Sequence, residues 1–501
     1  MVKNMVKNMM KKSILLTLPC LIASLGQGLS LAQTAPAPAA PAKQLGIEPP
    51  LGKAPVSKEV LKVKLPKAVE LKLDNGLTVL ILEDHRLPTV SMNLELRSAG
   101  ALREPAEMTG LASITASMLR EGAGARNSKQ IAETIEGLAA SIGAFAGQGG
   151  VGTNFSMSGM TENFDKWFPL AVDILLHPTF PADEWAKLKQ RQLIGLRTQR
   201  TSPQFLSRER FSKAVYGSHP ASIVSATPAS LEAITPEAMK KWHDERYVPQ
   251  DAILGIAGDV TAAQIMPKLK AAFAEWKKSD LKPATVPASS PAAEKSVLIV
   301  NRAGSVQTNL IMGNIAIDRR SPDYPALLVM NQVLGGGSTA RLFNNLREDK
   351  GYTYGAYSSV SAGEFAGPWE ASSEVRTDVT EGAMREFFNE FARIRDQKVP
   401  AAELDEKKRA VVARFALSME SPQTILNFAI TRKVYGLPED YWDTYPAQIS
   451  AVTPDDVQRV AKKYLNLDNI QIVAVGDVTK IKPVLEKYGK ITVYDVDGKV
   501  M

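Results

Sequence analysis

A long-range repeat constrains the fold of this chain more than any other feature of its sequence. Residues 235–247 and 252–260 follow the same pattern as residues 453–464 and 470–478, and the first residues of the two copies lie 218 positions apart. Each copy begins with Thr-Pro, which is typical of a helix N-cap followed by the first helical residue, and ends in an apolar run that closes with Gly-Asp-Val. Since solenoid repeats have periods of about 20–50 residues, this repeat indicates two domain-sized units of the same kind.

Both strand and helix patterns occur within one unit. Two alternating stretches, 69–73 and 77–82, flank Asp74-Asn75-Gly76 and predict a β-hairpin. A third strand is expected at 90–96. Helical spacing of apolar residues predicts helices over three further segments, the first of them capped by Ser128: 128–143, 164–176 and 183–199. The predicted fold class is therefore α+β, with two homologous domains that each consist of an antiparallel-rich sheet covered by helices.

The N-terminal residues resemble a secretory signal peptide. Residues 1–32 carry four lysines, a mostly apolar stretch at 14–25 and the small residues Ser30 and Ala32 at a cleavage position. A membrane span needs about 20 apolar residues, so this stretch predicts export to the periplasm without a stable span after cleavage. An uncleaved N-terminal anchor is the alternative.

Proline content divides the rest of the chain. Residues 33–66 are rich in Ala and Pro and predict an extended tether, and a second Pro-rich stretch at 282–295 predicts a linker. The two expected domains are accordingly residues 67–281 and 296–501.

Composition excludes several classes of function. Cys20 is the single cysteine and lies in the predicted leader, so neither a disulfide framework nor a cysteine-rich metal site is expected. The formal charge of +7 falls to +3 without the four leader lysines. Basic and acidic residues are interleaved elsewhere, and this pattern does not favour nucleic-acid binding.

Several short motifs resemble the pitrilysin-type zinc metallopeptidases, the group of the insulin-degrading enzymes and the mitochondrial processing peptidases. The resemblance covers residues 67 to about 490 and rests on these segments: 73–80 (LDNGLTVL), 109–112 (TGLA), 118–122 (MLREG), 177–180 (HPTF) and 346–354 (LREDKGYTY). It implies that the two domains form half of a clam-shaped peptidase.

The resemblance also implies that the zinc site has been lost. Active members carry H-x-x-E-H directly after Gly-Leu-Ala, with two zinc-binding histidines and a general base. Here Ser113 and Ser117 replace the histidines and Ala116 replaces the glutamate. The third ligand of the family is a glutamate on a later helix, and no acidic residue occurs between Glu184 and Glu209. We expect no metal in this chain, and no base is placed to activate a serine.

The second half keeps the residues that, in the family, hold the peptide and the developing oxyanion. Arg347 and Tyr354 match the arginine and tyrosine of that motif and lie seven residues apart. Donors of this kind stabilise an oxyanion strongly. The preceding run, residues 335–337, is glycine-rich, lacks the ending of a phosphate-binding loop and predicts a turn before a helix at 340–346. Whether this run handles substrate stays open.

Short members of the family work as two-chain enzymes, which leads to a specific hypothesis. This chain is expected to be the non-catalytic, substrate-binding subunit, inactive on its own, of a heterodimeric exported zinc metallopeptidase. Its partner would be a homologous chain with H-x-x-E-H that supplies zinc, and its substrate a peptide. The alternatives are a catalytically inert scaffold and a peptide-binding protein of the same fold.

Overall fold

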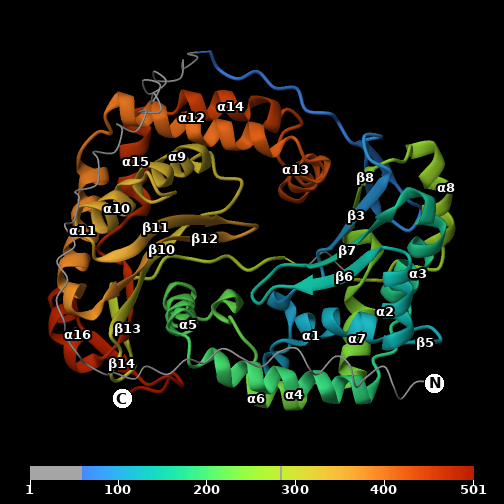
Figure 1. The fold of residues 1–501 in the computed structure, drawn as a ribbon, viewed down its shortest axis with the longest axis horizontal. Helices are drawn as coiled ribbons and strands as arrows, with labels where there is room; N and C mark the ends of the chain where they lie inside the picture. The colour runs from blue at the N-terminus through green and yellow to red at the C-terminus, as the bar shows by residue number, and fades with distance from the viewer. Residues whose placement is uncertain (1–58, 282–284) are drawn as a thin grey trace, which may run out of the picture. The chain divides into compact units, whose positions relative to one another are not determined.

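The computed structural model describes residues 59–281 and 285–501, and these contain two six-stranded sheets (Figure 1). The predicted leader and residues 33–58 of the predicted tether lie outside the described residues. The end of the tether region is fixed to the second half, because the Leu65 amide donates a 2.9 Å hydrogen bond to Asp443 Oδ1. No helix in the described ranges is both long and apolar enough to cross a membrane.

The first sheet has the order β1-β2-β8-β3-β7-β6. Its strands are β1 (Val69–Lys72), β2 (Thr78–Glu83), β3 (Thr89–Leu96), β6 (Ser141–Ala146), β7 (Thr153–Met160) and β8 (Ala252–Gly258). The predicted hairpin is confirmed as the antiparallel pair β1–β2. The strand β8 then inserts between β2 and β3 and runs parallel to β2, so the sheet is mixed.

The second sheet has the order β11-β12-β10-β13-β9-β14, and its first five strands repeat the first sheet from the opposite end. The sixth strand differs, because β14 runs parallel to β9 whereas β1 runs antiparallel to β2. Its strands are β9 (Ser296–Asn301), β10 (Gln307–Ile317), β11 (Thr353–Ala362), β12 (Ala366–Arg376), β13 (Gln471–Gly476) and β14 (Ile491–Tyr494). The pair β9–β13 is parallel, as β2–β8 is, and β6 and β11 occupy equivalent edges. The sequence repeat thus corresponds to a repeat of topology, and the predicted α+β class is confirmed with mixed sheets.

Helices cover both sheets. In the first half they are α1 (Leu111–Met118), α2 (Ser128–Gly137), α3 (Phe164–Leu176), α4 (Ala182–Gln199), α5 (Pro203–Tyr216), α6 (Pro228–Ala233), α7 (Pro236–Arg246) and α8 (Ala262–Ala272). In the second half they are α9 (Tyr324–Leu334), α10 (Arg341–Phe343), α11 (Thr380–Asp396), α12 (Ala401–Ser418), α13 (Pro422–Tyr435), α14 (Tyr441–Ala451), α15 (Pro454–Tyr464) and α16 (Val478–Leu485). A small hairpin joins β4 (Gly122–Ala123) to β5 (Arg126–Asn127).

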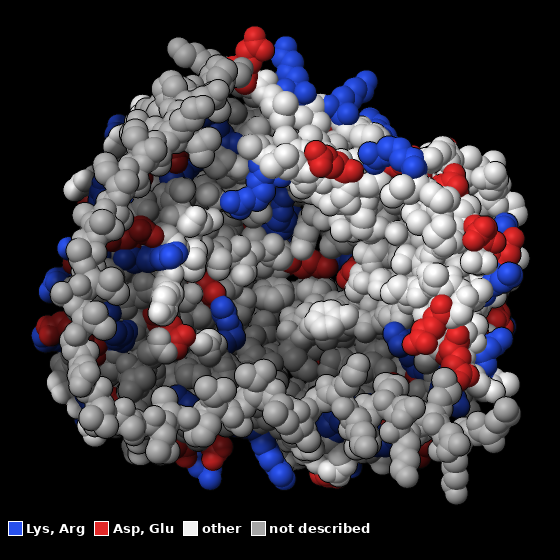
Figure 2. Space-filling model, in the orientation of Figure 1, with Lys and Arg blue, Asp and Glu red and all other residues white. Residues whose placement is uncertain are grey.

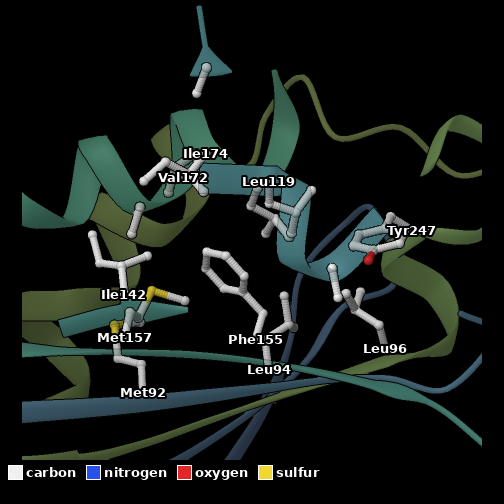
Figure 3. Packing of buried hydrophobic residues seen from close by; sticks show 14 of the residues in the cluster. Met92, Leu94, Leu96, Leu119, Ile142, Phe155, Met157, Val172, Ile174 and Tyr247 are labelled. Carbon is white, nitrogen blue, oxygen red and sulfur yellow. The ribbon is translucent and has the colours of Figure 1, made fainter. Parts of the chain in front are cut away.

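Alternation along the strands builds the core of each half. In β3 every second residue is buried, and Phe155 of β7 is fully buried beside them. Figure 3 shows Phe155 rising from the sheet among Leu94, Leu119 and the residues of α3. An equivalent core in the second half surrounds Trp369 and Phe391.

One helix of each half packs against the sheet of the other half. Leu426 and Ile430 of α13 form a cluster with buried residues of β2 and β8. Reciprocally, Phe211 and Val215 of α5 pack on β9, β10 and β13. The two helices are equivalent in the repeat, since each has 14 residues and begins with Pro after a serine. Hydrophobic contacts of α5 and α13 therefore join the two halves.

Two local expectations were wrong in detail. The helix predicted at 128–143 ends at Gly137, because Ala139 takes φ of 48° and β6 begins at Ser141. Its N-cap is Asn127, which forms a capping box with Gln130, so Ser128 is the first helical residue instead.

Candidate functional site

Arg347 lies in an irregular helical segment that continues α10. Residues Asn344–Asp349 form a π-helix, a wider turn that is frequent at functional sites. The helix predicted at 340–346 is thus longer and of mixed type. The Arg347 guanidinium carbon lies 4.8 Å from the Phe343 ring centre, and Nε lies 3.4 Å from Glu348 Oε1. Its side chain is 46% exposed, so an approaching ligand can reach it.

Tyr354 projects from the edge strand β11 at a β-bulge. The pairing of β11 with β12 shifts register between Thr353 and Ala356, which leaves Tyr354 and Gly355 as the irregular residues. Bulges redirect side chains and often occur beside active sites. Tyr354 is 89% exposed, the most exposed of the large hydrophobic side chains in the described residues. Its hydroxyl forms no hydrogen bond with another described residue.

Polar groups on both strands hold this bulge in place. Thr353 Oγ1 donates to the Glu374 carbonyl oxygen at 2.7 Å and accepts from the Gly355 amide at 3.0 Å. Ser373 Oγ donates to the Gly355 carbonyl oxygen at 2.9 Å. Side-chain hydroxyl groups therefore form the hydrogen bonds that the irregular backbone at Gly355 and Glu374 does not form between strands. These bonds hold the backbone next to the exposed Tyr354 ring in place.

A series of contacts leads from Arg347 to the residue that follows Tyr354. Phe343 lies beneath the Arg347 guanidinium and 5.6 Å from the Tyr357 ring. The Tyr357 ring covers the backbone of Gly355, where a Cβ atom would stand 2.6 Å from Tyr357 Cε2. These neighbours were not predicted from the sequence. The aromatic residue three positions after Tyr354 was the available signal, but a strand pattern explains it equally well.

The positions predicted to correspond to the zinc motif of the family, Ser113, Ala116 and Ser117, lie on α1. Ser113 Oγ donates to the Gly110 carbonyl oxygen at 3.1 Å and accepts from Gln148 Nε2 at 3.2 Å. Ser117 Oγ donates to the Ser113 carbonyl oxygen at 2.8 Å, and Ala116 is buried. Both hydroxyls donate to their own helix backbone. These side chains do not fit a zinc ion, because neutral hydroxyls and a methyl group are poor or impossible ligands.

Glu104 anchors the start of α1 and was missed by the sequence reasoning. Its carboxylate accepts hydrogen bonds from the Gly110 and Ala112 amides at 2.8 and 2.7 Å. Burial disfavours the ionised form more than these two amides favour it, and it raises the pKa of Glu104 to about 7. The element that would hold zinc in an active relative is thus held here by a carboxyl group.

The four histidines each contact a different carboxylate or backbone carbonyl group. His85 and His177 pair with Asp259 and Asp173 at 2.7 and 3.0 Å, and His219 and His243 contact backbone carbonyl oxygens. Within residues 59–281 and 285–501, no three His, Cys, Asp or Glu side chains gather as metal ligands do.

The glycine-rich run has a packing role. The Gly335 carbonyl oxygen accepts a 2.9 Å hydrogen bond from the Ser358 amide of β11, and a Cβ atom at Gly335 would stand 2.3 Å from that nitrogen. A Cβ at Gly336 would stand 2.7 Å from the Gln332 backbone. These glycines allow the turn after α9 to approach β11 closely.

Comparisons with known proteins show which proteins this chain is similar to. The family model of the peptidase M16 inactive domain matches residues 233–411, a range that includes Arg347 and Tyr354. A Rickettsia felis protein named an uncharacterized zinc protease is 25% identical over 421 residues, which are 81% of this chain and 97% of the relative. A Helicobacter pylori protein named a non-peptidase homolog is 21% identical and covers 80% of this chain and 92% of its own length.

Two solved structures have a fold similar to that of this chain. The crystal structure of a peptidase M16 inactive domain from Pseudomonas fluorescens has a TM-score of 0.76 and 28% identity, covering 82% of this chain and 98% of that one. A protease from Helicobacter pylori has a TM-score of 0.75 at 19% identity, covering 82% of this chain and all of that one, which shows a shared fold alone.

Proposed function

Because this chain belongs to the M16 (pitrilysin-like) peptidase family, we propose that it is the non-catalytic, substrate-binding subunit of a heterodimeric, exported zinc metallopeptidase. In this role Arg347 and Tyr354 bind the peptide and stabilise the oxyanion. A homologous partner with H-x-x-E-H supplies the zinc ion and the general base. The printed name of the Helicobacter pylori relative, a non-peptidase homolog, is consistent with a chain that does not cut peptides by itself.

The observation that carries the proposal is the contrast between the two candidate sites. Arg347 and Tyr354 expose a guanidinium and a phenol, both strong hydrogen-bond donors, on one surface-facing segment. Ser113 and Ser117 instead donate their hydroxyl hydrogens to the backbone of α1. Residues 347 and 354 therefore offer groups that can bind a carbonyl oxygen, whereas Ser113, Ala116 and Ser117 offer neither a zinc ligand nor a general base.

Reconstitution with a partner tests the proposal. The chain is purified alone and together with a homologous H-x-x-E-H chain from the same organism, and both samples are assayed for peptide cleavage and bound zinc. We expect cleavage and about one zinc per heterodimer only in the two-chain sample. A lone chain that binds stoichiometric zinc and cleaves peptides would contradict the proposal.

Paired variants then test the two side chains within the active complex. Arg347→Ala is expected to lower kcat by about 100-fold, the usual cost of losing an oxyanion donor. Arg385→Ala is the matched control, because Arg385 is exposed and lies 3.5 Å from the next glutamate, as Arg347 does. Tyr354→Phe, compared with Tyr357→Phe, isolates the role of the exposed hydroxyl. If Arg347→Ala leaves the complex fully active, the inert-scaffold alternative is favoured.

A further inference from the structure

Arg319 is a buried cation among aromatic rings, immediately after β10. It is 7% exposed, and one of its terminal nitrogens, NH1, donates a 2.8 Å hydrogen bond to the Tyr441 hydroxyl. Its guanidinium carbon lies 3.8 Å from the Tyr324 ring centre and 5.0 Å from that of Tyr441. The Trp442 ring is a third neighbour at 5.8 Å.

The charge of Arg319 has no acidic partner within the described part of the chain. No carboxylate oxygen there lies within 4.0 Å of its guanidinium, although the adjacent Arg320 pairs with Asp318 at 3.6 Å. A buried cation is normally paired, because removing it from water is costly. Three aromatic rings offset part of that cost through cation–π attraction but neutralise no charge.

A cavity of about 380 Å³ opens beside this guanidinium, between α9, α12, α13 and α14. Its apolar walls are mostly aromatic, with Leu328 and Val411 beside five rings: Tyr324, Phe415, Phe428, Trp442 and Tyr445. Besides Arg319, the polar side chains of the lining are Gln332, Arg414, Ser418 and Thr424. Gln332 is 7% exposed and its amide forms no hydrogen bond with another described residue, while Arg414 is exposed and forms no ion pair within the described ranges.

We infer that this cavity binds an organic carboxylate with an aromatic body. A planar guanidinium presents two parallel N–H groups that match a carboxylate, and the ligand would supply the negative charge that Arg319 lacks. The aromatic walls suit stacking or edge-to-face contact with a ring, and the Gln332 amide offers a further polar contact. The volume lies within the ordinary range of small-molecule pockets, about 300–1,000 Å³.

Two sources could present this chemistry, a free aromatic acid and the C-terminal residue of a peptide. Both bring a carboxylate and a ring within a few bonds of each other. The inference does not depend on the roles proposed for Arg347 and Tyr354, since none of the cavity residues is one of them.

Calorimetric titration of the full chain tests the site. The probes are 3-phenylpropionate, its neutral amide, phenyl phosphate, and the dipeptide acetyl-Ala-Phe with a free or an amidated C-terminus. We expect saturable binding of at least one carboxylate, at least about 10-fold tighter than its amide. Binding of 3-phenylpropionate indicates a free acid as the source, and binding of the dipeptide acid alone indicates a peptide terminus.

Variants locate the binding in the cavity. Arg319→Gln should abolish binding of the carboxylate, while Arg320→Gln, a neighbouring arginine that points to solvent, should leave it unchanged. Ser418→Trp, which places a large side chain in the cavity from α12 and keeps Arg319, should also abolish it and guards against misfolding of the first variant. Absence of saturable binding by either acid, preference for phenyl phosphate, or binding that survives Ser418→Trp would overturn the inference.

Discussion

The backbone of Gly255 in β8 lies directly against Ile430 of α13, so that a Cβ atom at residue 255 would stand 2.7 Å from Ile430 Cδ1. Leu426 of the same helix would be 3.0 Å away. Because residue 255 has no side chain, α13 of the second half can lie close to the first sheet, where Leu426 and Ile430 are buried. The junction between the halves is thus built like an interior, at close packing.

Filling that space should weaken the junction. Gly255→Val is expected to lower the free energy of unfolding by about 1–3 kcal/mol, because the Ile430 and Leu426 side chains must leave their packed positions. Denaturant titration gives the value. Gly143→Val is the matched control, since Gly143 also lies in a strand and an added Cβ there meets no atom within 4 Å. Equal effects of the two variants would contradict the close packing.

The bulge at Tyr354 should depend on Thr353. Thr353→Val keeps the shape of the side chain but removes the hydroxyl that bonds to Gly355 and Glu374. Unfolding free energy should fall by about 1 kcal/mol, the usual net contribution of such hydrogen bonds. In the reconstituted complex kcat should fall by about 10-fold, because misplacing a positioned group is costly. Ser359→Ala, at an exposed site on the same strand, is the control and should change neither the unfolding free energy nor kcat. If Thr353→Val lowers stability but leaves kcat unchanged, Thr353 contributes to folding and does not position Tyr354.

Asp323 should make the second half sensitive to acid. Burial disfavours its charged form, but hydrogen bonds from Tyr464, Lys463 and Arg459 outweigh that effect and lower the pKa of Asp323 to about 2. Because the folded pKa lies below the unfolded value, this stabilisation is present above about pH 4 and is lost as the pH falls toward 2.

The variant Asp323→Asn tests this dependence. It should lower the free energy of unfolding at pH 7 by about 2 kcal/mol, the free energy that corresponds to the lowered pKa of Asp323. The difference from the wild type should shrink below pH 3.8. Asp455→Asn, which breaks an exposed pair with Lys398, should cost less than about 1 kcal/mol. A pH-independent difference would contradict the assignment.

Glu104 should act with the opposite sign. Its pKa is raised to about 7, so the folded state favours the protonated carboxyl. Its contribution to stability is then complete below about pH 4.5 and is lost as the pH rises through 7. Glu104→Gln resembles the protonated form, and it should be more stable than the wild type at pH 8.5 by about 1–3 kcal/mol but not at pH 5.

Thermal or denaturant unfolding across that pH range measures the effect. Glu107→Gln, at an exposed position three residues further on, is the control and should follow the wild type at every pH. A Glu104→Gln curve parallel to that of the wild type would show that Glu104 does not titrate in this range.

The charge pattern of the sequence predicted how charged residues are distributed over the surface, but it did not predict the site at Arg319. Figure 2 shows acidic and basic side chains interspersed over the described surface on this side, in keeping with their interleaving in the sequence. The unpaired guanidinium of Arg319 is invisible in such a pattern. Its neighbour Arg320 has the same residue type and the opposite environment.

The sequence by itself determined the repeat, the α+β class, the β1–β2 hairpin and helices such as α3, because spacing and caps depend on residues close along the chain. The resemblance in the sequence also led to predictions that stay predictions, namely a lost zinc site at Ser113, Ala116 and Ser117 and a substrate-binding motif with Arg347 and Tyr354. Only the tertiary structure decided which sheet α5 and α13 cover, how a bulge exposes Tyr354, and that Glu104 is partly buried and Arg319 buried. Those outcomes depend on contacts between distant residues and on the removal of water, which no local pattern records.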